Sequence, residues 1–477
     1  MNKLILRSVV LFLSVLGCAI GPDYRRPAVE APPNWRFASD EAKNLANTAW
    51  WEQFNDPVLN SLIETALKEN KDVKIAAARI EEFLGRYWSA RSSLFPQVNA
   101  TGDAGRARVS ETGTSPVPDG VRNPAGFYNT ALNGSWEIDI WGRLRRVSEA
   151  ARAELLATGE GKRAVILTLV ASVANAYINL RDLDEQLDVA KRTAKSREDA
   201  YALFMLRFEG GLISDLELSQ ARSEYEQAAS TVPAIERAIA QQENALSVLL
   251  GKNPGPIERG KPIDDLVLPA VPAGIPSDLL ERRPDVRQAE QDLIAANARI
   301  GAARGLYFPS ISLTGSYGWS SADLSRLVRG ASEAWNWSGS FTAPIFTGGS
   351  IKGQVKAAEA VQQQALFRYQ QTIQTAFREV EDALADQNRT RAELESQRRQ
   401  VKALQNYAQV ARLRYDNGYT SYIEVLDAER SLFNAQLAYL KTQGALFQAL
   451  VNLYKAMGGG WVVEAERMTA EQAAADR

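Results

Sequence analysis

Few residues of this chain belong to the types that catalyse reactions or bind metals. Histidine is absent from all 477 residues, and the sequence contains one cysteine and four methionines. Histidine is the commonest general base and metal ligand, and sulfur ligands typify soft-metal sites. We therefore expect no catalytic residues, no metal centre and no enzymatic activity. The formal net charge of −2 gives no reason to expect a nucleic-acid partner.

One segment has the spacing of a phosphate-binding loop. Gly255, Gly260 and Lys261 match the pattern Gly-x4-Gly-Lys. Pro262, however, stands where a serine or threonine hydroxyl must bind magnesium, and no strand-like segment precedes the loop. The sequence therefore predicts no nucleotide site here, and no cofactor elsewhere apart from a covalent lipid.

The single cysteine, Cys18, stands at a position that indicates a specific modification. It follows an apolar stretch, residues 4–16, which has the length of an export signal and is too short to span a membrane as a helix. Gly17 precedes the cysteine as in a bacterial lipoprotein box, so we expect cleavage there and acylation of Cys18. Ala19 fits sorting to the outer membrane. No later stretch has 18 consecutive apolar residues, so no helical span is expected in the mature chain.

Two long parts of the chain repeat each other. Residues 206–228 align with residues 413–435 at an offset of 207, and residues 90–105 align with residues 303–318 at an offset of 213. Each copy is predicted to hold a helix, a strand pair, a very long helix, a glycine turn and a return helix. A unit of this kind, used twice, suits the wall of a tube better than a catalytic pocket. The matched pairs include Arg207 with Arg414, Gly211 with Gly418, Ser214 with Ser421, and Glu217 with Glu424.

The longest predicted helices, residues 143–209 and 350–417, contain no proline. At 1.5 Å per residue each would span about 100 Å, which suits the depth of a periplasm better than a globular core. In the first of them, apolar residues recur at steps of three and four, the pattern of coiled-coil packing. Each long helix ends at a glycine turn, and return helices extend to about residues 250 and 457.

Proline and polar caps set the other boundaries. A helix capped by Asp56 is predicted to continue unbroken to about residue 94, before Phe95-Pro96, and the second copy runs from Pro284 to Phe308-Pro309. The predicted organisation is a signal peptide (1–17), a lipid-anchored strap (18–55), a first repeat (56–250), a connector (251–283), a second repeat (284–457) and a tail (458–477).

After each Phe-Pro the sequence period changes from helical to alternating. Apolar residues such as Leu313 and Trp337 alternate with Ser312 and Asn336 and other polar residues. Alternation alone also fits a soluble sheet, but strands of about 10 to 14 residues with tryptophans near their ends are typical of a membrane barrel. The predicted strands cover about 97–109, 127–141, 309–320 and 335–347.

Four strands cannot close a barrel alone, because single-chain barrels start at about eight and an open edge in lipid leaves backbone groups unpaired. Three copies would supply twelve strands in a cyclic assembly. The expected fold class is therefore mixed α and β: a trimeric transmembrane β-barrel with four strands per chain, continuous with a long periplasmic α-helical barrel, and with an internal structural duplication.

These features together resemble the outer-membrane efflux proteins, the TolC-like outer-membrane factors, and more narrowly the lipoprotein subfamily that serves resistance–nodulation–division pumps. The likeness covers nearly the whole mature chain. Its marks are Gly21-Pro22-Asp23-Tyr24, Trp50-Trp51, Arg283-Pro284-Asp285, the run Ala-Ala-Asn-Ala-Arg-Ile-Gly-Ala-Ala-Arg at residues 295–304, residues 422–431, and Gly458-Gly459-Gly460-Trp461.

The resemblance implies a passive homotrimeric duct in the bacterial outer membrane, anchored by lipid and extending into the periplasm. Its implied partners are a periplasmic adaptor protein, an inner-membrane resistance–nodulation–division pump and outer-membrane lipid. Such a duct would export small molecules, namely drugs, toxic compounds or metal ions, and would catalyse nothing.

Two sites follow from the resemblance by position. Glu424, Asp427 and Tyr415 would form the periplasmic entrance, and the first two share a helix face because they are three residues apart. Some relatives link the entrance with a basic residue that Thr420 replaces here, so that link is not expected. The plain alternative for the acids is a solvated helix face. The adaptor-docking tips would comprise Gly211, Ser214, Gly418 and Ser421, whose plain alternative role is helix capping.

Three other functions remain open at this point. A duct for protein secretion would have the same fold and a different pump. A structural periplasmic coiled-coil lipoprotein would have the helices but no use for the inserted strands. A periplasmic adaptor would have one helical hairpin and separate soluble β domains, which two hairpins and lipid-type strands argue against.

Overall fold

The computed structural model describes residues 19–29, 32–37, 49–110, 112, 120, 122–269, 276–458, 461–463, 465 and 466. Cys18, the predicted lipidation site, lies outside the described residues. The chain divides into two compact units. The first comprises residues 1–28, 79–158 and 289–369, and the second comprises residues 29–78, 159–288 and 370–477.

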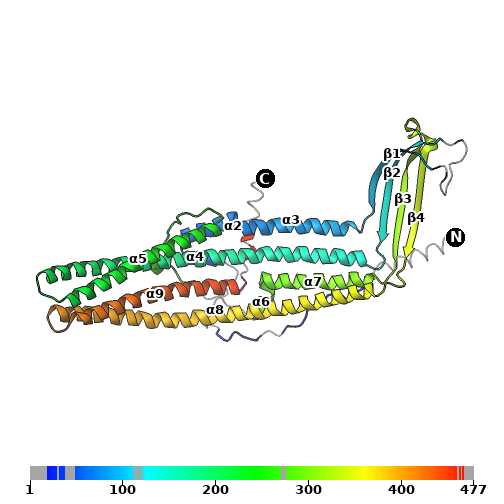
Figure 1. Cartoon of the computed structure of the whole chain (residues 1–477). Coiled ribbons are helices and arrows are strands. Elements are labelled where there is room, and N and C mark those ends of the chain that lie inside the picture. Colours follow the sequence, from blue (N-terminus) through cyan, green and yellow to red (C-terminus); the bar gives the residue numbers. More distant parts are fainter. Residues whose placement is uncertain are drawn as a thin grey trace. The chain divides into compact units, whose positions relative to one another are not determined.

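The first unit contains a four-stranded antiparallel sheet, in which the strands lie side by side in chain order (Figure 1). The strands are β1 (Gln97–Ala107), β2 (Ala125–Ile138), β3 (Ser310–Ser321) and β4 (Glu333–Thr342). Each repeat supplies one hairpin, and β2 pairs with β3 where the repeats meet. Among the described strands, β1 and β4 each have a neighbour on one side only, so both edges of the sheet are open.

The fourth strand is shorter than the sequence pattern predicts. It ends at Thr342, whereas alternation suggested an end near residue 347. Thr342 pairs with Ser310, the first residue of β3, so β4 has no partner beyond that point. Pro344 also lacks the N–H group that a longer ladder would need.

Long helices make up most of the second unit and part of the first. α4 (Arg143–Glu209) and α8 (Ser350–Asp416) each have 67 residues. Their return helices are α5 (Asp215–Leu249) and α9 (Tyr422–Ala456). The remaining helices are η1 (Trp50–Phe54), α2 (Pro57–Glu69), α3 (Lys71–Ser92), η2 (Ile263–Asp265), α6 (Pro276–Arg282), α7 (Pro284–Gly305), η3 (Leu324–Arg326) and η4 (Gly330–Ser332).

The single helix predicted from Asp56 to about residue 94 is wrong, because it breaks at Asn70. Asn70 has an extended ψ of 133° and separates α2 from α3. Its side-chain amide donates to the carbonyl of Leu249 at 2.9 Å, and its Oδ1 accepts from the backbone N–H groups of Asp72 and Val73. Asn70 therefore caps the start of α3 and ties it to the end of α5.

The main apolar core of the second unit brings together aromatic residues that are far apart in the sequence. The Trp50 ring stacks on Tyr454 at 5.3 Å, and Trp51 meets Trp461 edge to face at 4.9 Å. Trp50, Phe54 and Trp461 are buried against apolar residues of α2, α4 and α9. The motif residues Trp50, Trp51 and Trp461 therefore form part of this core.

Among the described helices, α4 is long and apolar enough to cross a membrane by length and composition. More than half of its most apolar window is buried against neighbouring elements. Such burial is typical of a core helix in a bundle.

Candidate functional site

The sheet has one polar and one apolar face, and the strand register keeps both continuous across all four strands. On the polar face, Asn133 donates to Thr101 at 2.9 Å, and the hydroxyls of Thr314 and Ser338 are 2.8 Å apart. On the opposite face, large apolar side chains are exposed to the surroundings; Leu132 is 55% and Trp337 is 78% exposed. A broad exposed apolar face of this kind marks contact with lipid or a partner.

The turns that end the two long helices are copies of each other. Gly211 and Gly418 have positive φ angles of 72° and 76°, which glycine adopts at low cost. Gly211 N–H donates to Phe208 O at 2.8 Å, and Gly418 N–H donates to Tyr415 O at 2.9 Å. Both glycines therefore reverse the chain after a helix, as predicted, and nothing lies within 4 Å of the position that a Cβ would occupy.

The serines that follow these turns differ in role. Ser214 forms a capping box with Glu217, in which the serine side chain and the glutamate side chain each bond the other residue's backbone N–H. Ser421, its counterpart, makes no side-chain cap bond to the first turn of α9. Capping, the plain alternative for these positions, therefore applies to Ser214.

Glu424, the counterpart of Glu217, has different partners. Arg414 Nη1 donates to Glu424 Oε1 at 2.8 Å, and the Thr420 hydroxyl donates to its other carboxylate oxygen. Asp427 pairs with Arg430 on the same helix at 3.0 Å. The two acids predicted to line the entrance therefore both lie on α9, and each has a cation of its own chain as a partner.

Arg414, which the sequence analysis did not single out, is the cation that pairs with Glu424. Thr420 occupies the position at which the resemblance implies a basic residue, and Arg414 at the end of α8 supplies a cation beside Glu424 instead. The repeat gave a usable signal, because Arg414 aligns with Arg207. Arg207 in turn donates to the Tyr415 hydroxyl at 3.2 Å.

Tyr415 belongs to an aromatic contact between the two helix pairs. Its ring lies 5.1 Å from that of Tyr422, which lies 4.2 Å from Phe204. Burial is the main cause that raises the pKa of Tyr422 to about 12, and the nearby Glu429 adds to it. Residues of α4, α5, α8 and α9 all contribute to this cluster, so it holds the two turns together.

A buried charged group lies next to this aromatic cluster. Arg197 is 4% exposed and binds both the carboxylate and the backbone carbonyl of Glu224 at 3.0 Å. Its guanidinium also lies 5.5 Å from the centre of the Phe433 ring. Burial raises the pKa of the Glu429 carboxyl and Glu224 raises it further, whereas Arg412 and Arg197 lower it. Nothing in the sequence distinguished these residues from other charges of a solvated coil.

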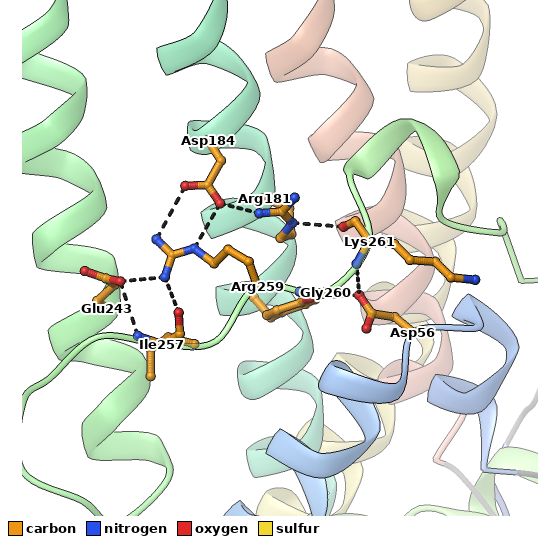
Figure 2. Close-up of polar contacts among 9 residues, drawn as sticks. Asp56, Arg181, Asp184, Glu243, Ile257, Arg259, Gly260 and Lys261 are labelled. Carbon is orange, nitrogen blue, oxygen red and sulfur yellow. Dashed lines mark hydrogen bonds and ion pairs between the residues drawn. The ribbon is translucent and has the colours of Figure 1, made fainter.

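The segment that imitates a phosphate loop forms a polar joint instead (Figure 2). Asp56 is fully buried, and its carboxylate accepts from the Tyr177 hydroxyl at 2.7 Å and from Lys261 N–H at 3.1 Å. Gly260 N–H donates to the Tyr177 hydroxyl at 2.9 Å. The backbone N–H groups of Gly260 and Lys261 are therefore bonded to protein oxygens.

Arg259 links the connector to α4 and α5. It donates to Asp184 of α4 at 3.0 Å and to Glu243 of α5 at 2.5 Å, as Figure 2 shows. Arg181 donates to the carbonyl of Lys261 at 2.9 Å. The connector is thus fixed to α2, α4 and α5 at once, and burial together with Asp56 raises the pKa of Tyr177 above its usual value.

Comparison with known proteins places these features in a family. The family model described as "Outer membrane efflux protein" matches residues 62–252 and 275–459, one match on each repeat. The toluene efflux pump outer membrane protein TtgC of Pseudomonas putida is 37% identical over 97% of this chain and 96% of its own length. The cation efflux system protein CusC of Escherichia coli is 36% identical over 94% of this chain and 97% of its own.

A solved structure agrees in fold with the chain. The crystal structure of the Campylobacter jejuni CmeC outer membrane channel matches with a TM-score of 0.87 at 27% sequence identity. The match covers 95% of this chain and 98% of that one. The helices and the four-stranded sheet therefore have the arrangement of an outer membrane channel.

Proposed function

The chain belongs to the outer membrane efflux protein family, and from this premise we propose that three copies of it close into one passive export duct. The protein is an outer-membrane channel of an efflux system. The twelve strands of three copies would form a barrel with the apolar faces in lipid and the polar faces around water. Its helices would extend the duct into the periplasm.

The open sheet is the observation that carries this proposal. Both β1 and β4 have one unpaired edge among the described strands, and Trp337 and Phe341 on β4 are highly exposed. In lipid each unsatisfied backbone group costs several kcal/mol, so an isolated four-stranded sheet is unstable there. Pairing β4 of one copy with β1 of the next removes every edge once three copies close.

The partners and the cargo belong to the same proposal. We propose that the turns at Gly211 and Gly418 dock a periplasmic adaptor, which connects the duct to an inner-membrane resistance–nodulation–division pump. Acylation of Cys18 would anchor the N-terminus in the outer membrane. The cargo would be small organic compounds or metal ions, the classes in the names of TtgC and CusC. The duct would supply a path and no catalysis.

Cysteine pairs at the open edges test the proposal. Thr101→Cys on β1, combined with Asn336→Cys, Ser338→Cys or Ser340→Cys on β4, places one thiol on each edge of the polar face. Oxidation should give covalent trimers for at least one pair. The control pair Asn133→Cys with Ser338→Cys puts one thiol on the inner strand β2, where no neighbouring copy can reach it.

If every edge pair stays monomeric under conditions that oxidise a control dithiol, the edges do not meet. The proposed closure is then wrong. Covalent dimers and trimers from the control pair would show that thiols of different molecules react by random collision. Cross-links between the edge strands would then no longer support the proposed closure.

A further inference from the structure

Two sequence motifs contact each other in the first unit. Neither motif has a role in the proposed duct. The motif at residues 21–24 lies in the strap, and the motif at residues 295–304 lies on α7. Asn297 of α7 donates from its side chain to Pro22 O at 2.9 Å. A Cβ added to Gly21 would lie 2.3 Å from the Cα of Gly301, and one added to Gly301 would lie 2.6 Å from Ile20 O. The strap therefore passes so close to α7 that both positions need glycine.

The start of α4 holds the same segment from the other side. Ile20 N–H donates to Trp141 O at 3.0 Å, just before α4 begins. The Arg146 guanidinium is 6% exposed, binds Asp23 at 2.7 Å and Glu149 at 2.9 Å, and donates to Ile20 O at 3.4 Å. Such a buried cation needs these acceptors, because burial without them would be costly.

Glu290 of α7 adds contacts further along the strap. The Tyr24 hydroxyl donates to Glu290 Oε1 at 3.0 Å, and Arg26 pairs with Glu290 Oε2 at 3.0 Å. Residues 20–26 thus meet groups of α4 and α7 over several successive positions. Contacts at this density are typical of a terminal segment that is tied to the body of the protein rather than of a passing linker. The residues of α4 and α7 that make these contacts are together called the groove.

This groove lies where the two repeats join at one end of the sheet. Trp141 follows β2, its Nε1 donates to Pro309 O at 2.8 Å, and its ring packs on Phe308 at 5.0 Å. Phe308 and Pro309 lead directly into β3. The strap therefore touches the end of the first repeat's hairpin and the helix that leads into the second repeat's hairpin.

We propose that the groove between the start of α4 and α7 is a docking site for strap residues 19–26, and that docking, independently of acylation, fixes the N-terminus at this end of the sheet. A lipid on Cys18 would then be attached one residue before the docked segment. Only the claim that this end of the sheet meets the periplasmic surface of the outer membrane rests on the proposed function.

Limited trypsin digestion of the full-length protein in detergent separates docking from acylation. The mature sequence offers its first tryptic bond after Arg25, and cutting there requires the strap to leave the groove. Gly301→Val fills the groove, and we expect cleavage after Arg25 to be about tenfold faster, because the loss of one or two hydrogen bonds shifts the docking equilibrium by that order. Cys18→Ser should be cut at the wild-type rate.

Two further variants make the result decisive. Gly353→Val is the matched control, since Gly353 is also helical and nothing lies within 4 Å of its added Cβ; it should be cut at the wild-type rate. Asn297→Ala removes one bond without adding bulk, and decides the question if Gly301→Val fails to assemble. Wild-type cleavage rates in both Gly301→Val and Asn297→Ala, or fast cleavage in Cys18→Ser, would overturn the proposal.

The mass of the released peptide reports acylation in the same experiment. An unmodified peptide released from the wild type would count against the proposed lipid anchor. The comparison of cleavage rates would still decide whether the strap docks. The two claims can therefore fail separately.

Discussion

At the scale of single residues, the duplicated chain uses the same glutamate in two ways. Glu217 closes a capping box with Ser214, whereas Glu424 pairs with Arg414 and leaves Ser421 without a side-chain cap bond. The resemblance placed Glu424 at the entrance, but it did not identify Arg414 as its partner. Arg414 lies on another helix, so only the folded structure shows that the two side chains meet. The two acids that the resemblance places at the entrance, Glu424 and Asp427, are therefore each paired with a cation of the same chain.

Charge substitutions in this pair should move ion selectivity in opposite directions. Glu424→Gln should weaken the preference for cations, and Arg414→Gln should strengthen it by freeing the carboxylate. The Arg414 side chain is 51% exposed and that of Glu424 is 25% exposed, so water screens the pair in part, and protein stability should change by only about 1 kcal/mol. Reversal potentials of single channels in planar bilayers measure the effect, with Glu424→Ala combined with Asp427→Ala as the strongest case. If the reversal potentials of all variants equal that of the wild type, Glu424 and Asp427 belong to an ordinary solvated helix face.

Glu429 should make stability depend on pH. Its pKa is raised above 4.5 by burial and by Glu224, so the folded state binds the proton more readily than the unfolded state. The stabilisation is complete below pH 4.5 and is lost as pH rises through the raised pKa. Glu429→Gln should therefore unfold at a higher temperature than wild type at pH 8, and the two should converge near pH 4.5.

Thermal melts followed by circular dichroism at both pH values check this, with the exposed Glu226→Gln as the control. A lower melting temperature for Glu429→Gln at pH 8 would mean that Arg197 and Arg412 require the charge of Glu429.

At the scale of elements, the connector between the two repeats packs too tightly to accept a side chain at residue 260. Gly260 packs so closely that an added Cβ would lie 2.2 Å from an oxygen of the buried Asp56 carboxylate. The connector therefore joins α2, α4 and α5 only if residue 260 has no side chain. The phosphate-loop spacing of this segment is a coincidence of glycines that serve packing.

Gly260→Ala should accordingly destabilise the second unit by about 1–3 kcal/mol, the usual cost of overpacking. Gly255→Ala in the same segment is the control, because its nearest neighbour would be 3.9 Å away. Chemical denaturation of the two variants in detergent measures the difference. Equal denaturation midpoints for the two variants would show that the connector can shift to make room for a methyl group at residue 260.

The element boundaries that follow from local signals could be read from the sequence. Proline, glycine and periodicity located both 67-residue helices and their turns to within a residue. The break at Asn70 could not be read, because it depends on a bond to Leu249, far along the chain. The end of β4 likewise depends on where β3 begins, and the Arg197 cluster depends on four helices meeting. Tertiary contacts decide these features.

At the scale of the whole molecule, duplication accounts for the sheet. Each repeat contributes one hairpin, and the hairpins join through β2 and β3 into a sheet with an apolar face and two open edges. One chain therefore carries one part of a barrel, and in the proposed assembly the remaining strands come from other copies. The claim that other copies complete the barrel is central to the proposed function.

The mass of the native protein in detergent tests that claim most directly, when strand content is measured on the same sample. We expect a complex of three chains whose β-sheet circular dichroism disappears together with the trimer as detergent or heat dissociates it. Cross-linking at saturation should stop at three copies. A stable monomer that keeps its full strand content, or a closed complex of another size, would contradict the account.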